Sequence, residues 1–208
     1  MLNIRTLARS CAATALMAVS ITASTMVAAP SAQADPVIPI DWTVDVTSHL
    51  AKLNKDLTVP TGTFKGGFDL ATSTITGDLA LPQATSRLDL GSLPLANVTL
   101  ALEQTAPVTG TVDLATLTAS TTATYNVRIV AIRPLFAPWV NLVKSTCVTR
   151  TPVSAGLAGP VDLTNGSTFS GAFDLGKFSG CGLGVNEIVN GIVPGPGNTI
   201  TARFTPTA

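Results

Sequence analysis

The sequence predicts an all-β protein: a single-domain antiparallel β-sandwich, or alternatively a small β-barrel, with one short C-terminal helix. Apolar residues recur at every second position over most of the chain, which is the pattern of strands that bury one face. Clusters of Gly, Pro, Asn, Asp and Ser separate these runs at short intervals, as in antiparallel folds with tight connections.

A motif that ends in Asp-Leu returns along the chain. Residues Thr63–Leu70 read T-F-K-G-G-F-D-L, and a close copy stands at Thr168–Leu175. The core G-x-Φ-D-L, with Φ apolar, recurs at Gly110–Leu114 and Gly159–Leu163. We interpret each copy as a strand that runs into a turn, because an Asp carboxylate accepts N–H groups of the residues that follow. A calcium loop would need a denser spacing of carboxylates. The copies are expected at equivalent places in two sheets.

The strands follow in chain order. Residues 35–41 contain Pro36 and Pro39 and predict an extended leader, and a strand at 57–59 is expected to stop at Pro60. Further strands are predicted at 42–53, 62–81 (a hairpin), 87–90, 96–102, 108–114, 117–131, 146–149, 153–157, 169–175 and 200–204. The longest run, 117–131, should pair with 108–114 and should bend or be shared between two sheets.

The period of the apolar residues changes near the C-terminus. Between Leu183 and Ile192 these residues recur as on a helix, and Pro194 follows directly. We therefore predict a short helix at 183–192 that covers one end of a sheet, followed by a turn at 194–198.

Residues 1–34 predict a cleaved signal peptide. Arg5 and Arg9 precede a run of small and apolar residues, and Ala32–Ala34 reads as a cleavage site. A membrane anchor is the alternative, but no basic flank follows the run. Residues 35–208 then form the single β-sandwich domain. No later stretch is long and apolar enough for a spanning helix, so we do not expect an integral membrane protein after cleavage.

The charge balance of the cleaved chain is weakly negative. The whole sequence has twelve Lys and Arg and twelve Asp and Glu, and the first 34 residues contain two of the basic and none of the acidic ones. Ten basic residues therefore stand against twelve acidic ones. Because phosphate backbones attract basic surfaces, nucleic acid is not an expected partner.

Two cysteines, Cys147 and Cys181, remain after cleavage. Exported proteins keep their cysteines oxidised, and neither residue has the His or acidic neighbours that a metal site would use. We predict a disulfide between them and a secreted, extracellular protein that is either released or associated with the cell envelope.

Residues 133–144, R-P-L-F-A-P-W-V-N-L-V-K, interrupt the strand pattern. Two prolines exclude a regular strand or helix interior, and the apolar side chains leave two interpretations. The segment plugs one end of the fold, or it forms an exposed loop in which Leu135, Phe136 and Trp139 bind a lipid, a glycan or a partner.

Residue types that carry catalysis are sparse. His49 is the only histidine, and Ser48 beside it would point to the opposite face of a strand. The two glutamates, Glu103 and Glu187, are far apart in sequence, and no phosphate-binding, dinucleotide or zinc motif occurs. We expect no enzyme, no metal and no cofactor.

Seven short motifs follow one another across most of the chain after residue 44. They are Leu57–Pro60, Gly62–Phe64, Thr76–Pro82, Thr109–Val112, Phe169–Gly171, Cys181–Leu183 and Val193–Thr199. Their order resembles a group of small secreted proteins of high-GC Gram-positive bacteria. The resemblance implies export, a β-rich domain and one disulfide, and it supplies no catalytic residues.

Four functional hypotheses follow. The first is a non-enzymatic secreted or envelope-associated protein that binds through the apolar loop, with an envelope lipid or glycan as its partner. The second is an extracellular carrier of a lipid or another apolar ligand, which needs an internal cavity. A hydrolase with aspartates around His49 is the third, and a self-assembling surface-layer component is the fourth.

Overall fold

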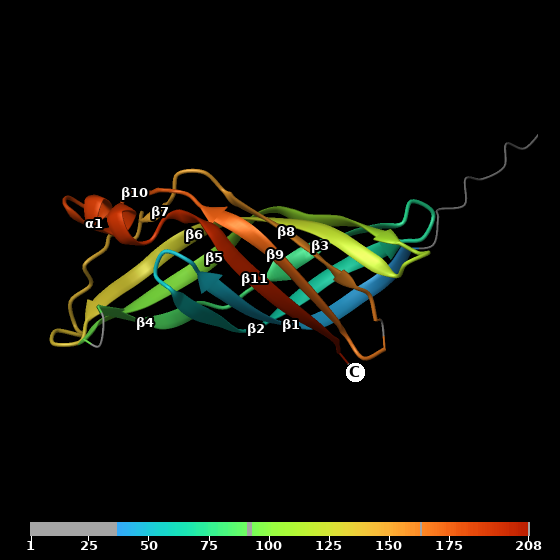
Figure 1. Ribbon diagram of the computed structural model, residues 1–208, viewed down its shortest axis with the longest axis horizontal. Coiled ribbons are helices and arrows are strands. Elements are labelled where there is room, and N and C mark those ends of the chain that lie inside the picture. The colour runs from blue at the N-terminus through green and yellow to red at the C-terminus, as the bar shows by residue number, and fades with distance from the viewer. Residues whose placement is uncertain (1–36, 91–92, 163, 208) are drawn as a thin grey trace, which may run out of the picture. The chain divides into compact units, whose positions relative to one another are not determined.

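The computed structural model describes residues 37–90, 93–162 and 164–207, which form eleven β-strands and one α-helix (Figure 1). The strands are β1 (Val37–Leu50), β2 (Lys55–Asp69), β3 (Thr74–Ala80), β4 (Ala84–Leu90), β5 (Leu93–Asp113), β6 (Thr118–Pro134), β7 (Val148–Thr149), β8 (Val153–Pro160), β9 (Ser167–Leu175), β10 (Phe178–Ser179) and β11 (Gly195–Pro206). The helix is α1 (Val185–Ile192). The predicted all-β class with one short C-terminal helix is confirmed. The predicted signal peptide, 1–34, lies outside the described residues.

Eight of the strands close into an antiparallel barrel. Their order around the barrel is β6, β8, β9, β11, β1, β2, β3 and β5, and β5 pairs with β6 to close the ring. The closing register runs from Ala96 opposite Pro134 to Asp113 opposite Thr118. On its other side β5 pairs with β3 and, in its first half, with β4, while β7 and β10 extend the sheet beside β6.

The β-sandwich expectation is wrong, and the barrel alternative is correct. A strand with one buried face alternates in the same way in both architectures, so the sequence period cannot distinguish them. The pairing of β5 with β6 distinguishes the two architectures: although its register shifts at three places, it runs from Ala96 to Asp113 and leaves one sheet instead of two. The motif copies therefore do not lie in two sheets. Asp69 and Asp113 are the last residues of β2 and β5, and Asp162 follows β8. These three strands run in the same direction, whereas Asp174 lies on β9, which runs in the opposite direction.

Several predicted strand limits are also wrong: the strands predicted at 96–102 and 108–114 are one strand, β5. Proline explains two further differences. β1 already begins at Val37, and Pro39 is tolerated because it has a strand partner on one side only. β2 continues through Pro60 because a register shift at Asp45 places the proline in a β-bulge, where it need not donate a ladder hydrogen bond. The hairpin at 62–81 is confirmed as β2 and β3.

The turn predicted at 194–198 is absorbed into β11. Its register against β9 shifts between Gly195 and Asn198, with Gly197 at a φ of 77°. Asn198 is fully buried there, accepts a hydrogen bond from the Ala51 N–H (3.1 Å) and donates to the Gly195 carbonyl (2.8 Å). The residues of the predicted turn therefore form an irregular first part of β11 instead of a separate turn.

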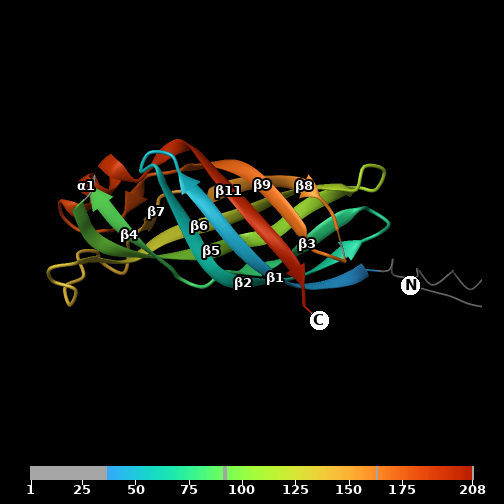
Figure 2. The ribbon, with the colours of Figure 1, turned by 60° about the horizontal axis from the view of Figure 1, so that its bottom comes forward.

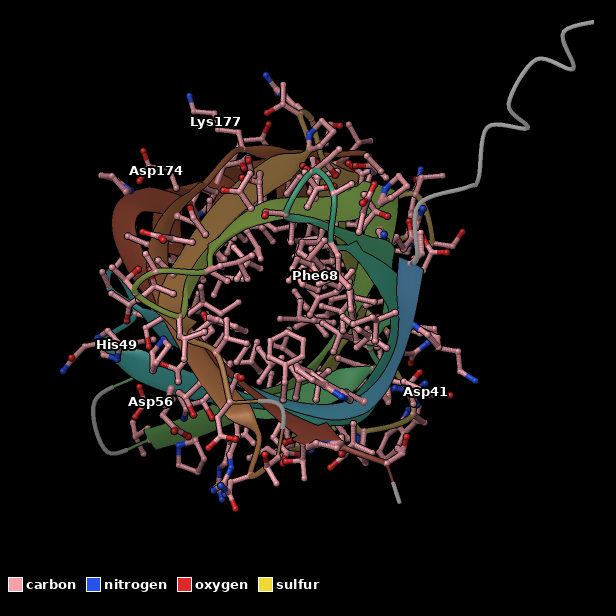
Figure 3. The ribbon with its side chains drawn as sticks, turned by 90° about the vertical axis from the view of Figure 1, so that its right-hand side faces the viewer. Asp41, His49, Asp56, Phe68, Asp174 and Lys177 are labelled. Carbon is pink, nitrogen blue, oxygen red and sulfur yellow. A yellow bond between two sulfur atoms is a disulfide. The ribbon has the colours of Figure 1, made fainter. Side chains whose placement is uncertain are left out.

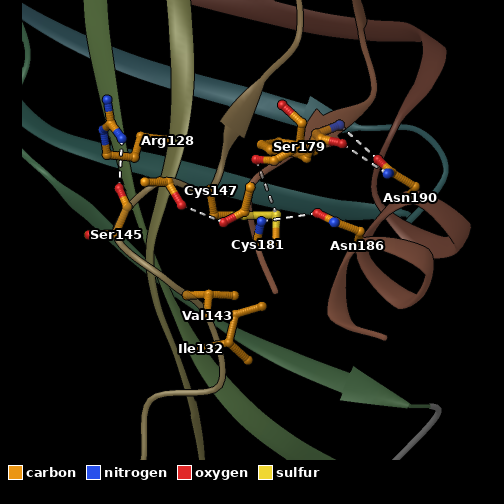
Figure 4. The surroundings of a disulfide bond; sticks show 12 residues. Arg128, Ile132, Val143, Ser145, Cys147, Ser179, Cys181, Asn186 and Asn190 are labelled. Carbon is orange, nitrogen blue, oxygen red and sulfur yellow. Dashed lines mark hydrogen bonds between the residues drawn. A yellow bond between two sulfur atoms is a disulfide. The ribbon is translucent and has the colours of Figure 1, made fainter. Parts of the chain in front are cut away.

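The predicted disulfide between Cys147 and Cys181 is present, and both residues are fully buried (Figure 4). It joins the segment after β6 to the segment before α1. The Lys144 N–H donates to the Cys181 carbonyl (3.0 Å), and Arg128 donates to the Ser145 carbonyl (2.7 Å). These bonds fix the loop 133–144 and α1 at one end of the barrel.

We call that end the helix end; β4 lies there as well (Figure 1, Figure 2). The opposite end carries the β2–β3, β5–β6 and β8–β9 connections and is called the mouth end. The core near the mouth is aromatic: the ring centroid of Phe204 lies 6.1 Å from Trp42, 5.8 Å from Phe64 and 5.4 Å from Phe169. These pairs pack edge to face or tilted, as aromatic quadrupoles favour.

Candidate apolar-ligand site

The barrel interior is hollow at the mouth end (Figure 3). The hollow measures about 500 Å³, and Phe68 points into it. Each of the eight barrel strands contributes inward-facing side chains to its wall. The strand residues are Ile40, Trp42, Phe64, Phe68, Ile75, Leu79, Val108, Val112, Thr121, Ala123, Leu157, Phe169 and Phe204, and Leu114, Leu117, Val161, Asp162 and Thr164 complete the rim. We call this space the mouth hollow.

The sequence of β6 explains why space remains inside the barrel. The inward face of its first half carries Ala119, Thr121 and Ala123, which are small, and only afterwards Tyr125 and Val127. Small side chains on a barrel wall leave the axis unfilled unless the opposite strands carry larger ones. The hollow ends where the large side chains of β6 begin.

Few polar groups face the mouth hollow. The Thr121 hydroxyl donates to the Leu157 carbonyl (3.4 Å), which leaves Asp162 and Thr164 at the rim as the other polar contributors. A water molecule in the interior would find few hydrogen-bond partners, because it needs two to four of them. The geometry therefore suits an apolar group inside and a polar group at the rim.

A second apolar hollow lies at the helix end and measures about 450 Å³. It is bounded by the start of β2, by β4 and β5, and by α1. A smaller apolar space of about 80 Å³, which we call the waist, lies between the two hollows. Leu79 and Leu157 line both the waist and the mouth hollow, and Leu57 and Leu100 line both the waist and the second hollow. Tyr125 lines the waist, and burial raises the pKa of its phenol, so the waist stays uncharged.

The turns at the mouth confirm the interpretation of the repeated aspartates for three of the four copies, and Asp174 of the copy at Thr168–Leu175 is the exception. Asp69 accepts the backbone N–H groups two and three residues on (2.9 and 3.3 Å), and Asp113 does the same (2.8 and 3.3 Å). Hydrogen bonds from Thr72, through its hydroxyl first and then its backbone N–H, lower the pKa of Asp69. The Thr116 hydroxyl, followed by the N–H groups of Ala115 and Thr116, lowers the pKa of Asp113. Both residues are therefore carboxylates at neutral pH.

Asp162 forms a third turn of this kind in the β8–β9 connection. It accepts the N–H groups of Thr164 and Asn165 (both 2.8 Å), and the bond from Asn165 is the main cause that lowers its pKa. Asp174 differs, because it accepts the N–H of Gly197 (3.1 Å) across the sheet. Three carboxylates thus stand around the mouth and one stands at the helix end.

The site residues predicted in the loop 133–144 lie at the other end of the barrel. Phe136 is 85% exposed and Trp139 78%, while Leu135 is exposed to 37%. The loop is ordered by Asn141, whose carboxamide bonds the backbone of Ile132 and of Val130 (3.0 and 3.1 Å). Phe136 and Trp139 therefore do not plug the barrel, and the exposed-loop interpretation describes their positions.

His49 lies on the outer surface, where its Nδ1 is 2.7 Å from Asp56 Oδ1 (Figure 3). Ser48 points inward, as expected, and its hydroxyl donates to the Thr199 carbonyl (3.1 Å). The structure therefore does not bring Ser48 and His49 together. Over the ranges 37–90, 93–162 and 164–207, no group of three or more His, Cys, Asp and Glu residues is arranged to hold a metal ion.

The mouth hollow was not predicted. Its wall residues alternate like those of any half-buried strand. No residue type or spacing in the sequence marks an internal cavity. Two signals were available: the small inward residues of β6, and the apolar Leu114 and Leu117 in a turn.

No protein-family model, curated protein or solved structure was found to match this chain. Within the described part of the chain, no helix has the length and apolar character needed to cross a membrane.

Proposed function

We propose that this protein binds an apolar or amphiphilic small molecule in the mouth hollow and acts as a non-enzymatic carrier. The observation that supports the proposal is the hollow itself: about 500 Å³, almost entirely apolar, and edged by exposed rim residues. Its size falls within the range of about 300–1,000 Å³ that is typical of small-molecule sites. An alkyl chain or aromatic group occupies the interior, and the polar part of the ligand lies near Asp162 and Thr164.

The disulfide is compatible with an extracellular location, because such bonds persist in oxidising compartments. We accordingly propose a secreted carrier. The hydrolase hypothesis gains no support from the aspartates of the repeat, since Asp69, Asp113 and Asp162 serve as turn residues.

A fluorescence titration tests this proposal. The mature chain, residues 35–208 in the oxidised form, is titrated with phenylnaphthylamine, an uncharged probe that becomes bright in apolar surroundings, and the probe is then displaced with dodecanol. Ile75 faces the mouth hollow, and its neighbour Thr76 faces solvent on the same strand. Ile75→Trp fills the hollow and should abolish saturable binding, whereas Thr76→Trp should bind like the wild type.

Circular dichroism establishes that both variants fold. If Ile75→Trp does not fold, Val161→Trp fills the same hollow from the β8–β9 connection. Equal probe binding by the wild type and by a folded Ile75→Trp variant would contradict the proposal.

A further inference from the structure

The large exposed apolar side chains gather at the two ends of the barrel. Those around the mouth accompany the proposed ligand site. A larger group lies at the helix end, where Phe136, Trp139, Leu142, Leu183 and Ile188 are exposed, Leu183 completely. We call these five residues the tip. The proposed carrier function does not use them.

The tip is one surface although its residues come from different segments. Phe136 and Leu142 of the loop and Ile188 of α1 line the same hollow at the helix end. The disulfide and the bond from the Lys144 N–H to the Cys181 carbonyl join the loop to the segment that contains Leu183. The tip is therefore held in place by covalent and backbone bonds, and its apolar surface continues into the second hollow.

The chemistry of the tip matches a lipid surface. Trp is enriched where proteins meet the headgroup region of a bilayer, because its ring is apolar and its indole N–H is polar. Here Trp139 and Phe136 project from one loop, and each is more than three-quarters exposed. Large apolar side chains gathered on a surface in contact with water do not stabilise the fold, and such patches mark sites that contact a partner or a membrane.

The charges around the tip favour an anionic surface. Arg133 and Lys144 delimit the loop, no acidic residue lies between them, and neither has an ion pair within the described chain. The acidic Asp89 of β4 is already paired with Lys55 and Arg87. The opposing charges at this end are Glu187 on α1, Asp174 near the end of β9, and Asp56, which contacts His49.

We propose that the helix end docks onto a lipid bilayer that contains anionic headgroups, with Phe136 and Trp139 inserted at headgroup level. Arg133 and Lys144 lie against the anionic headgroups. The proposal does not depend on the mouth hollow, and it identifies the partner of the predicted loop as an envelope lipid and not a glycan.

Vesicle flotation tests the proposal with the mature, oxidised chain. The probes are vesicles of phosphatidylcholine alone and of phosphatidylcholine mixed with phosphatidylglycerol. The wild type should float with the mixed vesicles and less with the neutral ones. Phe136→Ser/Trp139→Ser should weaken binding by roughly tenfold or more, because two large apolar side chains are lost from the interface.

The matched control is Val37→Ser/Leu70→Ser, which removes two exposed apolar side chains at the mouth end and should float like the wild type. For the charges, Arg133→Gln/Lys144→Gln should weaken binding to the mixed vesicles by about fivefold per charge, whereas Lys65→Gln/Arg203→Gln near the mouth should not. In a Trp42→Phe background, the emission of Trp139 should shift to the blue on the mixed vesicles.

Three results would overturn docking. They are the absence of the wild type from the floated fraction, flotation of Phe136→Ser/Trp139→Ser equal to that of the wild type, and a Trp139 emission that does not shift. A dimer that sediments in the ultracentrifuge and is lost in Phe136→Ser/Trp139→Ser, without vesicle binding, would assign the tip to a second copy of the chain instead.

Discussion

Leu117 in the β5–β6 turn occupies the position that Ser73 occupies in the β2–β3 turn, and both have a left-handed backbone, with φ of 52° and 54°. The turns match in their aspartates and their threonine hydroxyl pairs, each 2.8 Å apart. Left-handed backbone costs a non-glycine residue about 1–2 kcal/mol. The left-handed backbone at Leu117 therefore lowers the stability of the fold, and the leucine side chain lies at the rim of the mouth hollow.

We expect Leu117→Gly to separate folding from binding. Glycine adopts the left-handed region without strain, so thermal unfolding should occur at the wild-type temperature or above it. The phenylnaphthylamine affinity should fall, because an apolar rim contact is lost. A variant that melts earlier and binds the probe unchanged would show that Leu117 serves the fold and not the ligand.

The turn aspartates predict a pH dependence of stability. The folded pKa of Asp69 and that of Asp113 lie below the ordinary value of 3.8. Their stabilisation is therefore fully present above pH 3.8 and is lost as the pH falls through the folded pKa values. Asp69→Ala/Asp113→Ala should melt at a lower temperature than the wild type at neutral pH.

That difference should shrink in acid, which calorimetry at a series of pH values measures. A gap between the two melting temperatures that stays constant from neutral to strongly acidic pH would contradict the assignment of these hydrogen bonds to the carboxylates.

The disulfide should contribute substantially to stability. It closes a separation of 34 residues, which corresponds to on the order of 4 kcal/mol in the chain-entropy description. Cys147→Ser/Cys181→Ser should therefore unfold at a lower guanidinium concentration. Because the bond fixes the loop to α1, amide hydrogen exchange should accelerate first at residues 133–144. Uniform acceleration over the barrel would contradict this local role.

Several features of the fold were predictable because they depend on neighbours in sequence. The hairpin at 62–81, the turns after Asp69 and Asp113, and the helix near residue 185 follow from local periodicity and turn chemistry. The disulfide followed from the prediction of export, which leaves two cysteines in residues 35–208. Barrel closure was not predictable, because it depends on pairing between β5 and β6 and on where bulges fall.

The candidate sites divide in the same way. The loop containing Phe136 and Trp139 was identifiable because apolar residues beside two prolines break a strand pattern. Its exposure was not predictable, because the same sequence is compatible with a buried plug and with an exposed loop. The mouth hollow exists only if side chains on the opposite wall of the barrel do not fill the space beside Ala119 and Ala123. No local sequence pattern gives the distance between opposite walls.

The measurement that tests the proposed carrier function most directly is a crystal structure of residues 35–208 grown with a long-chain alcohol that carries bromine at its end. The anomalous signal locates the bromine without reference to the protein. The expected peak lies inside the mouth hollow, among Phe64, Phe68 and Val112, with the hydroxyl near Thr164. An empty mouth hollow with bromine peaks only on the outer surface or at the tip would contradict the account.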